Sequence, residues 1–381
     1  MTTSPAPVSP PPNVRVVDPV PYTPTPIERA KTFLKRHGRK LWWLHSCYAL
    51  ALGVSVVVFA QKGFDHARWL AVSVSAAWLL VIVFFRLFGS GKKQTPMVGA
   101  TPKAKLRFFA MTYALKNLYQ GMLFFLLPFY FKSTSFSSPN VWFVVLLAVC
   151  ALLSTLDIVF DRVLFKFRVL ASIFHAVALF GVLNLVVPAL FPDTRTLVSL
   201  LVATAITVLG FWTIHVDYHM LKDKRWIAAF GASLVGALGG VYAARTAIPP
   251  VPMYVAHGAV GPIVLKDGRL GMEVRDLHSS VVDKLIAITD VVVPGGKGDR
   301  LVHVWRHDGH EFHRANEQSS LVPFVVADDT HKDKSKDKGT IRLRSQLTGG
   351  QLPPNVVGSW TVDVETQDGQ LVGRVAFNVV E

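Results

Sequence analysis

Apolar residues are not spread evenly along the chain. From about Leu41 to Ala247 they form repeated runs of roughly 20 residues, the helical length that spans a hydrocarbon core of ~30 Å. We therefore predict a membrane α-helical bundle of about seven transmembrane helices. Their expected ranges are residues 41–60, 68–88, 109–131, 141–160, 168–190, 196–216 and 227–247.

The pattern changes after Pro249, where short segments with alternating apolar and polar residues replace the long runs. In "GSWTVDVETQDGQLVGRVAFNVV", Trp360, Val362 and Val364 alternate with polar residues, as a strand with one buried face requires. Further candidate strands are "LIAITDVVV", "LVHVWRH", "EFHRA", "LVPFVVA" and "TIRLRSQL". Short strands with frequent turns predict an all-β, sandwich-like domain.

These patterns predict four parts. Residues 1–27 form a proline-rich, disordered tail on the cytoplasmic side, because proline fixes φ and removes a backbone donor. Residues 28–40 form a basic amphipathic helix that lies on anionic lipid. Residues 41–248 form the transmembrane domain, and residues 249–381 form the extracytoplasmic β-domain.

The net charge of +15 raises the question of nucleic-acid binding. The basic excess, however, lies in short loops beside the apolar runs, such as "FGSGKKQTPMVGATPKAKLR", "DRVLFKFR" and "LKDKRW". The intervening loops "KSTSFSSPN" and "FPDTRT" carry little net charge. This alternation follows the positive-inside rule, so we expect no nucleic-acid partner, a cytoplasmic N-terminus and an extracytoplasmic β-domain.

Several ionisable or polar residues fall inside the predicted spans, where such groups are costly and suggest function. With the predicted topology they share the cytoplasmic half of the membrane. They are Lys116, Gln120, Asp157, His175, His215 and His219. In one hypothesis they pair with one another and fix helix packing.

In a second hypothesis, His215 and His219 bind a metal with His175 and Asp157, in a membrane-embedded hydrolase or lipid-modifying enzyme. This would be similar in outline to the seven-span zinc hydrolases of the ceramidase and progestin-receptor superfamily. Those enzymes place a paired-histidine motif in the last span, whereas the last span here has no histidine. A transporter is the third hypothesis.

The stretch "HVWRHDGHEFH" has four histidines in eleven positions, which could indicate a metal site. Asp308-Gly309 predicts a type I′ turn between two strands. In that hairpin His307 faces His310, Trp305 faces Phe312, and His313 lies opposite Val304. Only two imidazoles then converge, too few for a zinc site, so we favour a structural or solvent-facing hairpin over a metal site.

The C-terminal block resembles domain of unknown function 2914, and the membrane region is similar to domain of unknown function 5924. The first resemblance rests on His303, Trp305, Gly358, Trp360, Val362, Asp368, Gly369, Phe377 and Val379. The second rests on "YQGMLFFLLPFYF", "LLSTLDIVFDR" and "FHAVALF". The resemblance implies a bacterial inner-membrane protein and no particular activity. Arg344 stands where the first family has an aromatic residue, and Gly121 stands where the second tends to have glutamate.

The chain shows no P-loop, dinucleotide-binding fingerprint, GxSxG elbow or CxxC pair. We therefore favour a non-enzymatic membrane protein without a cofactor, whose partners are the lipid bilayer and a protein or envelope ligand. The expected binding surface of the β-domain comprises Trp305, Arg306, Arg342 and Arg344. The alternative for Trp305 is a place in the core.

Overall fold

The computed structural model describes residue 47 and residues 68–89, 101–156, 159–191, 194–216, 220–265, 270–293, 299–315 and 340–381. Cys47 is helical and exposed. The expected tail, the basic helix, the rest of the span at 41–60 and the strand "LVPFVVA" lie outside the described residues.

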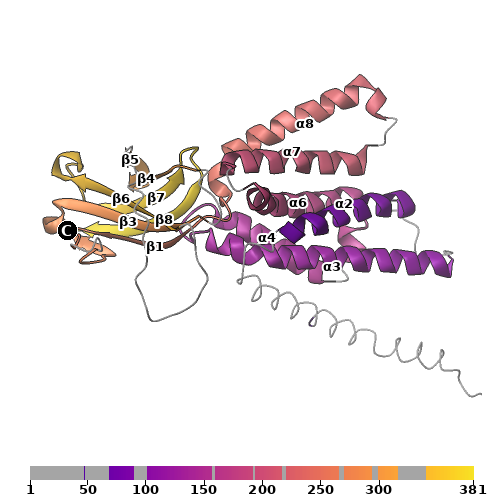
Figure 1. Cartoon of the computed structure of the whole chain (residues 1–381), viewed down its shortest axis with the longest axis horizontal. Coiled ribbons are helices and arrows are strands. Elements are labelled where there is room, and N and C mark those ends of the chain that lie inside the picture. The colour runs from indigo at the N-terminus through magenta and orange to yellow at the C-terminus, as the bar shows by residue number, and fades with distance from the viewer. Residues whose placement is uncertain are drawn as a thin grey trace, which may run out of the picture. The chain divides into compact units, whose positions relative to one another are not determined.

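Six α-helices coincide with the other predicted spans (Figure 1). They are α2 (Arg68–Phe88), α3 (Pro102–Lys132), α4 (Val141–Thr155), α6 (Arg168–Leu190), α7 (Thr196–His215) and α8 (Lys224–Ala243). The helices α2, α6, α7 and α8 are long and apolar enough to cross a membrane. Helix α4 ends at Thr155, five residues before the predicted end at 160, and one turn of π-helix follows, η3 (Phe160–Leu164).

Local sequence signals account for two of the helix starts. The Thr101 hydroxyl accepts a hydrogen bond from the amide of Ala104, and Pro102 occupies the first helical position. The Asp223 carboxylate caps α8 by accepting from the amide of Arg225. Side-chain oxygens satisfy amides that lack partners within the first turn, and proline is preorganised there.

Aromatic side chains fill the core at one end of the helical region. Phe88 of α2 lies 5.2 Å from Phe108 of α3, and Phe84 lies 5.6 Å from Phe165, measured between ring centroids. Edge-to-face pairs of this kind add to the free energy gained by burial. These contacts bring the end of α2, the start of α3 and the segment before α6 together at one end of the helices.

The described residues of the C-terminal part form eight strands in two sheets. The three-stranded sheet has the order β1 (Tyr254–Gly261), β3 (Lys284–Val292), β6 (Thr340–Thr348). The five-stranded sheet has the order β2 (Asp276–His278), β8 (Leu371–Val380), β7 (Gly358–Thr366), β4 (Leu301–His307), β5 (His310–Arg314). We refer to residues 254–380 as the β-region.

The two sheets share a buried core that has a polar layer between two apolar clusters. Leu347 packs with Trp305 in one cluster, and Leu343 packs with Leu301 in the other. Between them lies buried His303 on β4. Its Nε2 is 2.8 Å from Thr289 Oγ1 on β3, and its Nδ1 is 2.7 Å from Ser345 Oγ on β6. One imidazole therefore links the two sheets.

The histidine-rich hairpin has the predicted turn but a shifted register. Asp308 and Gly309 both have positive φ, 48° and 81°, as a type I′ turn requires. His307 pairs with His310 as predicted. A bulge after Trp305 then places His313 opposite it, and Arg314 opposite Val304. The predicted pairing of Trp305 with Phe312 and of His313 with Val304 is therefore wrong, because a bulge adds one residue to a strand.

Stability should fall in mild acid because of His303. Burial lowers its pKa from 6.5 to about 4, so the unfolded chain binds more protons than the folded chain between those values. His303 then contributes fully above pH 6.5, and its contribution is lost as the pH falls towards 4, by about 3 kcal/mol. Thermal unfolding of the full chain in detergent, followed by tryptophan fluorescence at about pH 7.5 and about pH 5, should show about 2 kcal/mol of this loss.

His303→Leu serves as the test variant. It should melt lower at both pH values, because Thr289 and Ser345 lose a partner, but its melting temperature should change less with pH. Replacing exposed His278 with glutamine is the matched control and should leave the wild-type pH dependence intact. Equal pH dependence in the wild type and His303→Leu would contradict the assignment.

Candidate functional site

Two of the predicted polar positions in the helical region lie beside hydroxyl groups on neighbouring helices. The Tyr119 hydroxyl of α3 lies 2.6 Å from Nδ1 of His175 on α6, and both side chains are fully buried. The other ring nitrogen of His175, Nε2, is buried and has no partner among the described residues. At this distance the phenol and the imidazole form one hydrogen bond, and this bond joins α3 to α6.

The second pair joins α6 to α7. Nε2 of His215 lies 2.7 Å from Ser172 Oγ, which is also 2.9 Å from the carbonyl oxygen of Arg168. If the serine donates its proton to that carbonyl, it accepts from the imidazole. Ser172 and His175 lie one turn apart on α6. The Arg168 guanidinium lies 5.7 Å from the ring centroid of Phe85.

The structure describes only part of the predicted cluster. Lys116 and Gln120 are buried on α3, and the Lys116 ammonium lies 5.4 Å from the Tyr113 ring centroid. Asp157 and His219 lie outside the described residues. Within the part that is described, no group of three or more His, Cys, Asp or Glu side chains could hold a metal ion. The metal site therefore stays a prediction.

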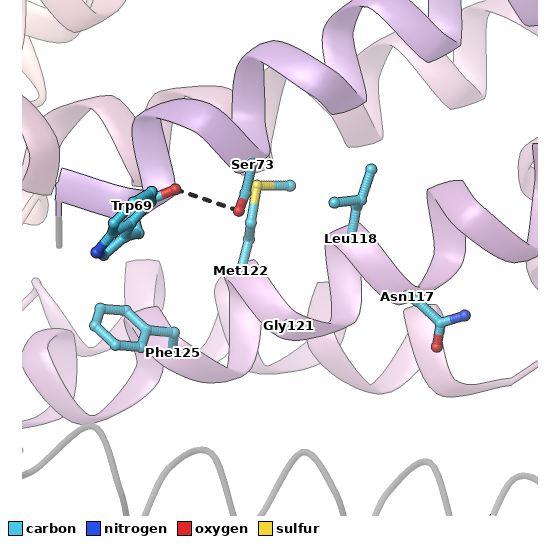
Figure 2. A pocket seen from close by; sticks show the side chains of 7 residues that line it. All are labelled: Trp69, Ser73, Asn117, Leu118, Gly121, Met122 and Phe125. Atoms are coloured by element: carbon cyan, nitrogen blue, oxygen red, sulfur yellow. Dashed lines mark hydrogen bonds between the residues drawn. The ribbon is translucent and has the colours of Figure 1, made fainter. Parts of the chain in front are cut away.

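A shallow groove runs along the outside of α2 and α3 (Figure 2). Its volume is about 310 Å³, and it is lined by Trp69, Ser73, Asn117, Leu118, Gly121, Met122 and Phe125. Figure 2 shows the rings of Trp69 and Phe125 at one end and the Asn117 amide at the other. The groove holds no titratable group, so it offers apolar contact and one amide rather than acid–base chemistry.

The expected binding surface of the β-region is only partly a surface. Trp305 is fully buried, packs 6.5 Å from Phe377 and donates its indole proton to Ser345 Oγ at 3.0 Å. Of the two places considered for Trp305, a binding surface and the core, the structure shows the core. Arg342 forms a two-pronged ion pair with Asp290 at 2.6 and 2.8 Å, whereas Arg344 is exposed.

An ion network lies on the outer face of the five-stranded sheet. Asp363 and Glu365 on β7 are 1% and 4% exposed, although strand alternation places them on a polar face. Arg306 bonds both carboxylates at 2.8 and 2.9 Å, and Arg374 bonds Asp363 at 2.5 and 2.8 Å. Burial lowers the pKa of Arg306, but its two carboxylate partners outweigh this and raise it.

Sequence reasoning missed this network, although a signal was present. Arginines at 306 and 374 occupy strands that flank β7, and Arg374 pairs in register with Asp363. Opposite charges at facing positions of neighbouring strands favour each other. The network was not recognisable earlier because the strand order β8-β7-β4 was unknown from the sequence.

Loops at the ends of three helices form hydrogen bonds with the β-region. After α3, Ser135 Oγ accepts from the Arg374 amide at 3.0 Å. At the start of α7, the Thr196 amide donates to Asp299 at 2.9 Å. After α8, Arg245 donates to the carbonyl oxygen of Asp368 at 2.8 Å. Burial raises the pKa of Asp299. We call these helix ends the junction end, and we call the opposite ends, which meet at Phe88 and Phe108, the basic end.

The β-region also presents an apolar hairpin beyond β1. Ile263, Leu265 and Met272 are 61%, 51% and 51% exposed, and an isolated bridge joins Val264 to Leu270. Single exposed apolar residues are ordinary, but adjacent ones indicate a contact surface. No sequence pattern singled out this segment.

Comparison with known proteins gives two matches to family models. Residues 23–283 match a family of unknown function, DUF5924, and residues 298–379 match a protein of unknown function, DUF2914. No curated protein and no solved structure matches the chain.

Replacing Asp363 with asparagine should destabilise the β-region by about 3 kcal/mol, because Arg306 and Arg374 lose a shared and buried carboxylate. Thermal and denaturant unfolding of the full chain measure the loss. Glu311→Gln is the matched control, because Glu311 pairs with Arg314 in a more exposed place and should matter by less than about 1 kcal/mol. Equal effects of the two substitutions would show that the network is not a buried one.

Proposed function

The chain belongs to the DUF5924 family of unknown function, and we propose that it is an integral bacterial inner-membrane protein with a β-sandwich outside the cytoplasm. About seven spans anchor the sandwich, and the sandwich binds a protein partner in the cell envelope. The observation that carries the proposal is the difference in charge between the two ends of the helices, described below.

Exposed apolar surface supports the membrane location. No residue of α8 is buried, and Val235 on that helix is 72% exposed. Exposure of apolar surface to water costs roughly 25 cal/mol per Å². A bilayer removes that cost, and it tolerates helices because their backbone groups are paired internally.

Several exposed aromatic side chains lie near the junction end, as others do near the basic end. Trp69 begins α2, Trp142 begins α4, Phe191 follows α6, and Tyr242 lies near the end of α8. All four are at least 49% exposed. Tryptophan and tyrosine favour the boundary between acyl chains and headgroups, which supports a membrane surface at this level.

The cations are distributed unequally between the two ends. At the basic end lie Arg86, Lys103, Lys105, Arg107, Lys166, Arg168, Lys222, Lys224 and Arg225. At the junction end the described cations are Arg68, Lys132, Arg195 and Arg245. Lysine and arginine favour the cytoplasmic side of spanning helices, so the basic end is cytoplasmic and the β-region is outside.

Thiol labelling tests this topology. In a Cys47→Ser background, cysteine replaces either Arg344 on β6 or Lys222 between α7 and α8, both exposed. A membrane-impermeant maleimide should label the Arg344 position in spheroplasts and the Lys222 position only after permeabilisation. Buried Cys150 is the internal background. The opposite pattern would place the β-region inside the cell and contradict the proposed topology.

The apolar hairpin is the proposed contact with the partner. Strand β1 begins after η5 (Arg245–Ala247) at the junction end, and Ile263 lies beyond its far end. Eight residues of strand span roughly 26 Å, so the hairpin projects away from the membrane surface. Among the described residues it presents Ile263, Leu265 and Met272 together, and this apolar surface fits a protein with an apolar face better than a polar envelope ligand.

Site-specific cross-linking tests the contact. A photoreactive residue at Met272 should give an adduct of defined mass in cells, and Ile263→Glu in the same chain should abolish it. The same photoreactive residue at position 344, on the surface that carries the exposed Arg344, is the matched control. An adduct at Arg344 alone would move the interface to the arginines, and no adduct at either would contradict a binding role for the β-region.

A further inference from the structure

A second groove lies between α2, α6 and α7, in the half of these helices nearer the junction end. Its volume is about 370 Å³. It is lined by Ala71, Val74, Ser75, Leu183, Val186, Val187, Leu190, Phe191, Thr194, Val198, Val202 and Ile206. The Ser75 hydroxyl donates to the carbonyl oxygen of Ala71 at 2.7 Å, so its polarity is satisfied. The walls are therefore almost entirely aliphatic.

The groove opens outward rather than into the protein. Leu190, Phe191 and Val198 line it and are each at least 45% exposed. In the membrane location proposed above, this opening faces the acyl chains of the extracytoplasmic leaflet. Its volume suits one acyl chain or a small molecule. A helix with its side chains is ~10–12 Å across, which is too wide for this groove.

A cation lies beside one end of the groove. Arg195 follows the lining residue Thr194, stands one turn before Val198, and has an exposed side chain. The first amide of α7, that of Thr196, is already capped by Asp299. The charge of Arg195 also acts on the nearby Asp299 carboxylate. Among the described residues at this end of the groove, the exposed Arg195 guanidinium is the group that can meet an anion, at the level of the aromatic side chains of the junction end, where lipid phosphates lie.

We propose that this groove binds an acyl chain of an anionic glycerophospholipid of the extracytoplasmic leaflet, with the lipid phosphate held by Arg195. The proposal rests on the membrane location and topology argued above. Aliphatic walls and one cation at the mouth complement a chain attached to an anionic headgroup. The lipid would lie directly below Asp299, so its headgroup would meet the base of the β-region.

Native mass spectrometry of the delipidated full chain tests the site, with phosphatidylglycerol and phosphatidylcholine as probes. The wild type should bind one phosphatidylglycerol saturably and more tightly than phosphatidylcholine. Val198→Trp fills the groove and should weaken that binding at least about tenfold, because the acyl chain of the lipid would lose most of its buried apolar area. Val149→Trp, at a comparably exposed position on α4, is the matched control and should not weaken it.

Arg195→Gln tests the contact with the lipid headgroup separately from the contact with the acyl chain. It should remove the preference for phosphatidylglycerol while the remaining affinity becomes equal for the two lipids. Ala71→Leu fills the groove from α2 and gives a second test should Val198→Trp fold poorly. Unsaturable binding, or equal binding by the wild type and both filling variants, would overturn the site. If alkaline carbonate released the protein from membranes, that result would instead contradict the membrane location itself.

Discussion

The described helices leave much of their apolar surface exposed, and their structure depends on what covers that surface. Helix α8 contacts α7 through Trp212, which lies 5.7 Å from Phe230, yet none of its residues is buried. Helical backbone groups are satisfied within each helix, so a bilayer can replace protein as the surrounding medium. The composition of the chain, 51% hydrophobic and 17% charged, follows from this constraint.

Polar groups in both parts of the chain are held in pairs that join separate elements. Tyr119 and His175 link α3 to α6 in the buried interior, where an unpaired polar group would be costly. In the β-region, Asp363 is buried because Arg306 and Arg374 accompany it from both neighbouring strands. The backbone amide of Arg374 also donates a hydrogen bond to Ser135 in the loop after α3. The same residue therefore takes part in the ion network of the sheet and contacts the helical region.

The elements were more predictable than the contacts between them. Helix α6 has the predicted bounds because its apolar run ends at charged residues and at the turn after Leu190. Strand alternation could not decide which face is covered, since Asp363 is buried only when arginines of β4 and β8 flank it. Both a surface place and a core place were open for Trp305 for a related reason, because the exposed face and the buried face of a strand cannot be told apart until the second sheet is known. The Tyr119–His175 pair required the relative rotation of α3 and α6, which no periodicity reveals.

Depth measurements along α8 test most directly whether a bilayer surrounds the helices. In liposomes, a nitroxide attached at Val235→Cys should be accessible to oxygen, which concentrates in lipid, and shielded from a water-soluble nickel chelate. A nitroxide at Lys222→Cys, beyond the helix start, should show the reverse. If the nickel chelate reaches the label at position 235 as readily as the label at 222, α8 lies in water and the membrane account fails.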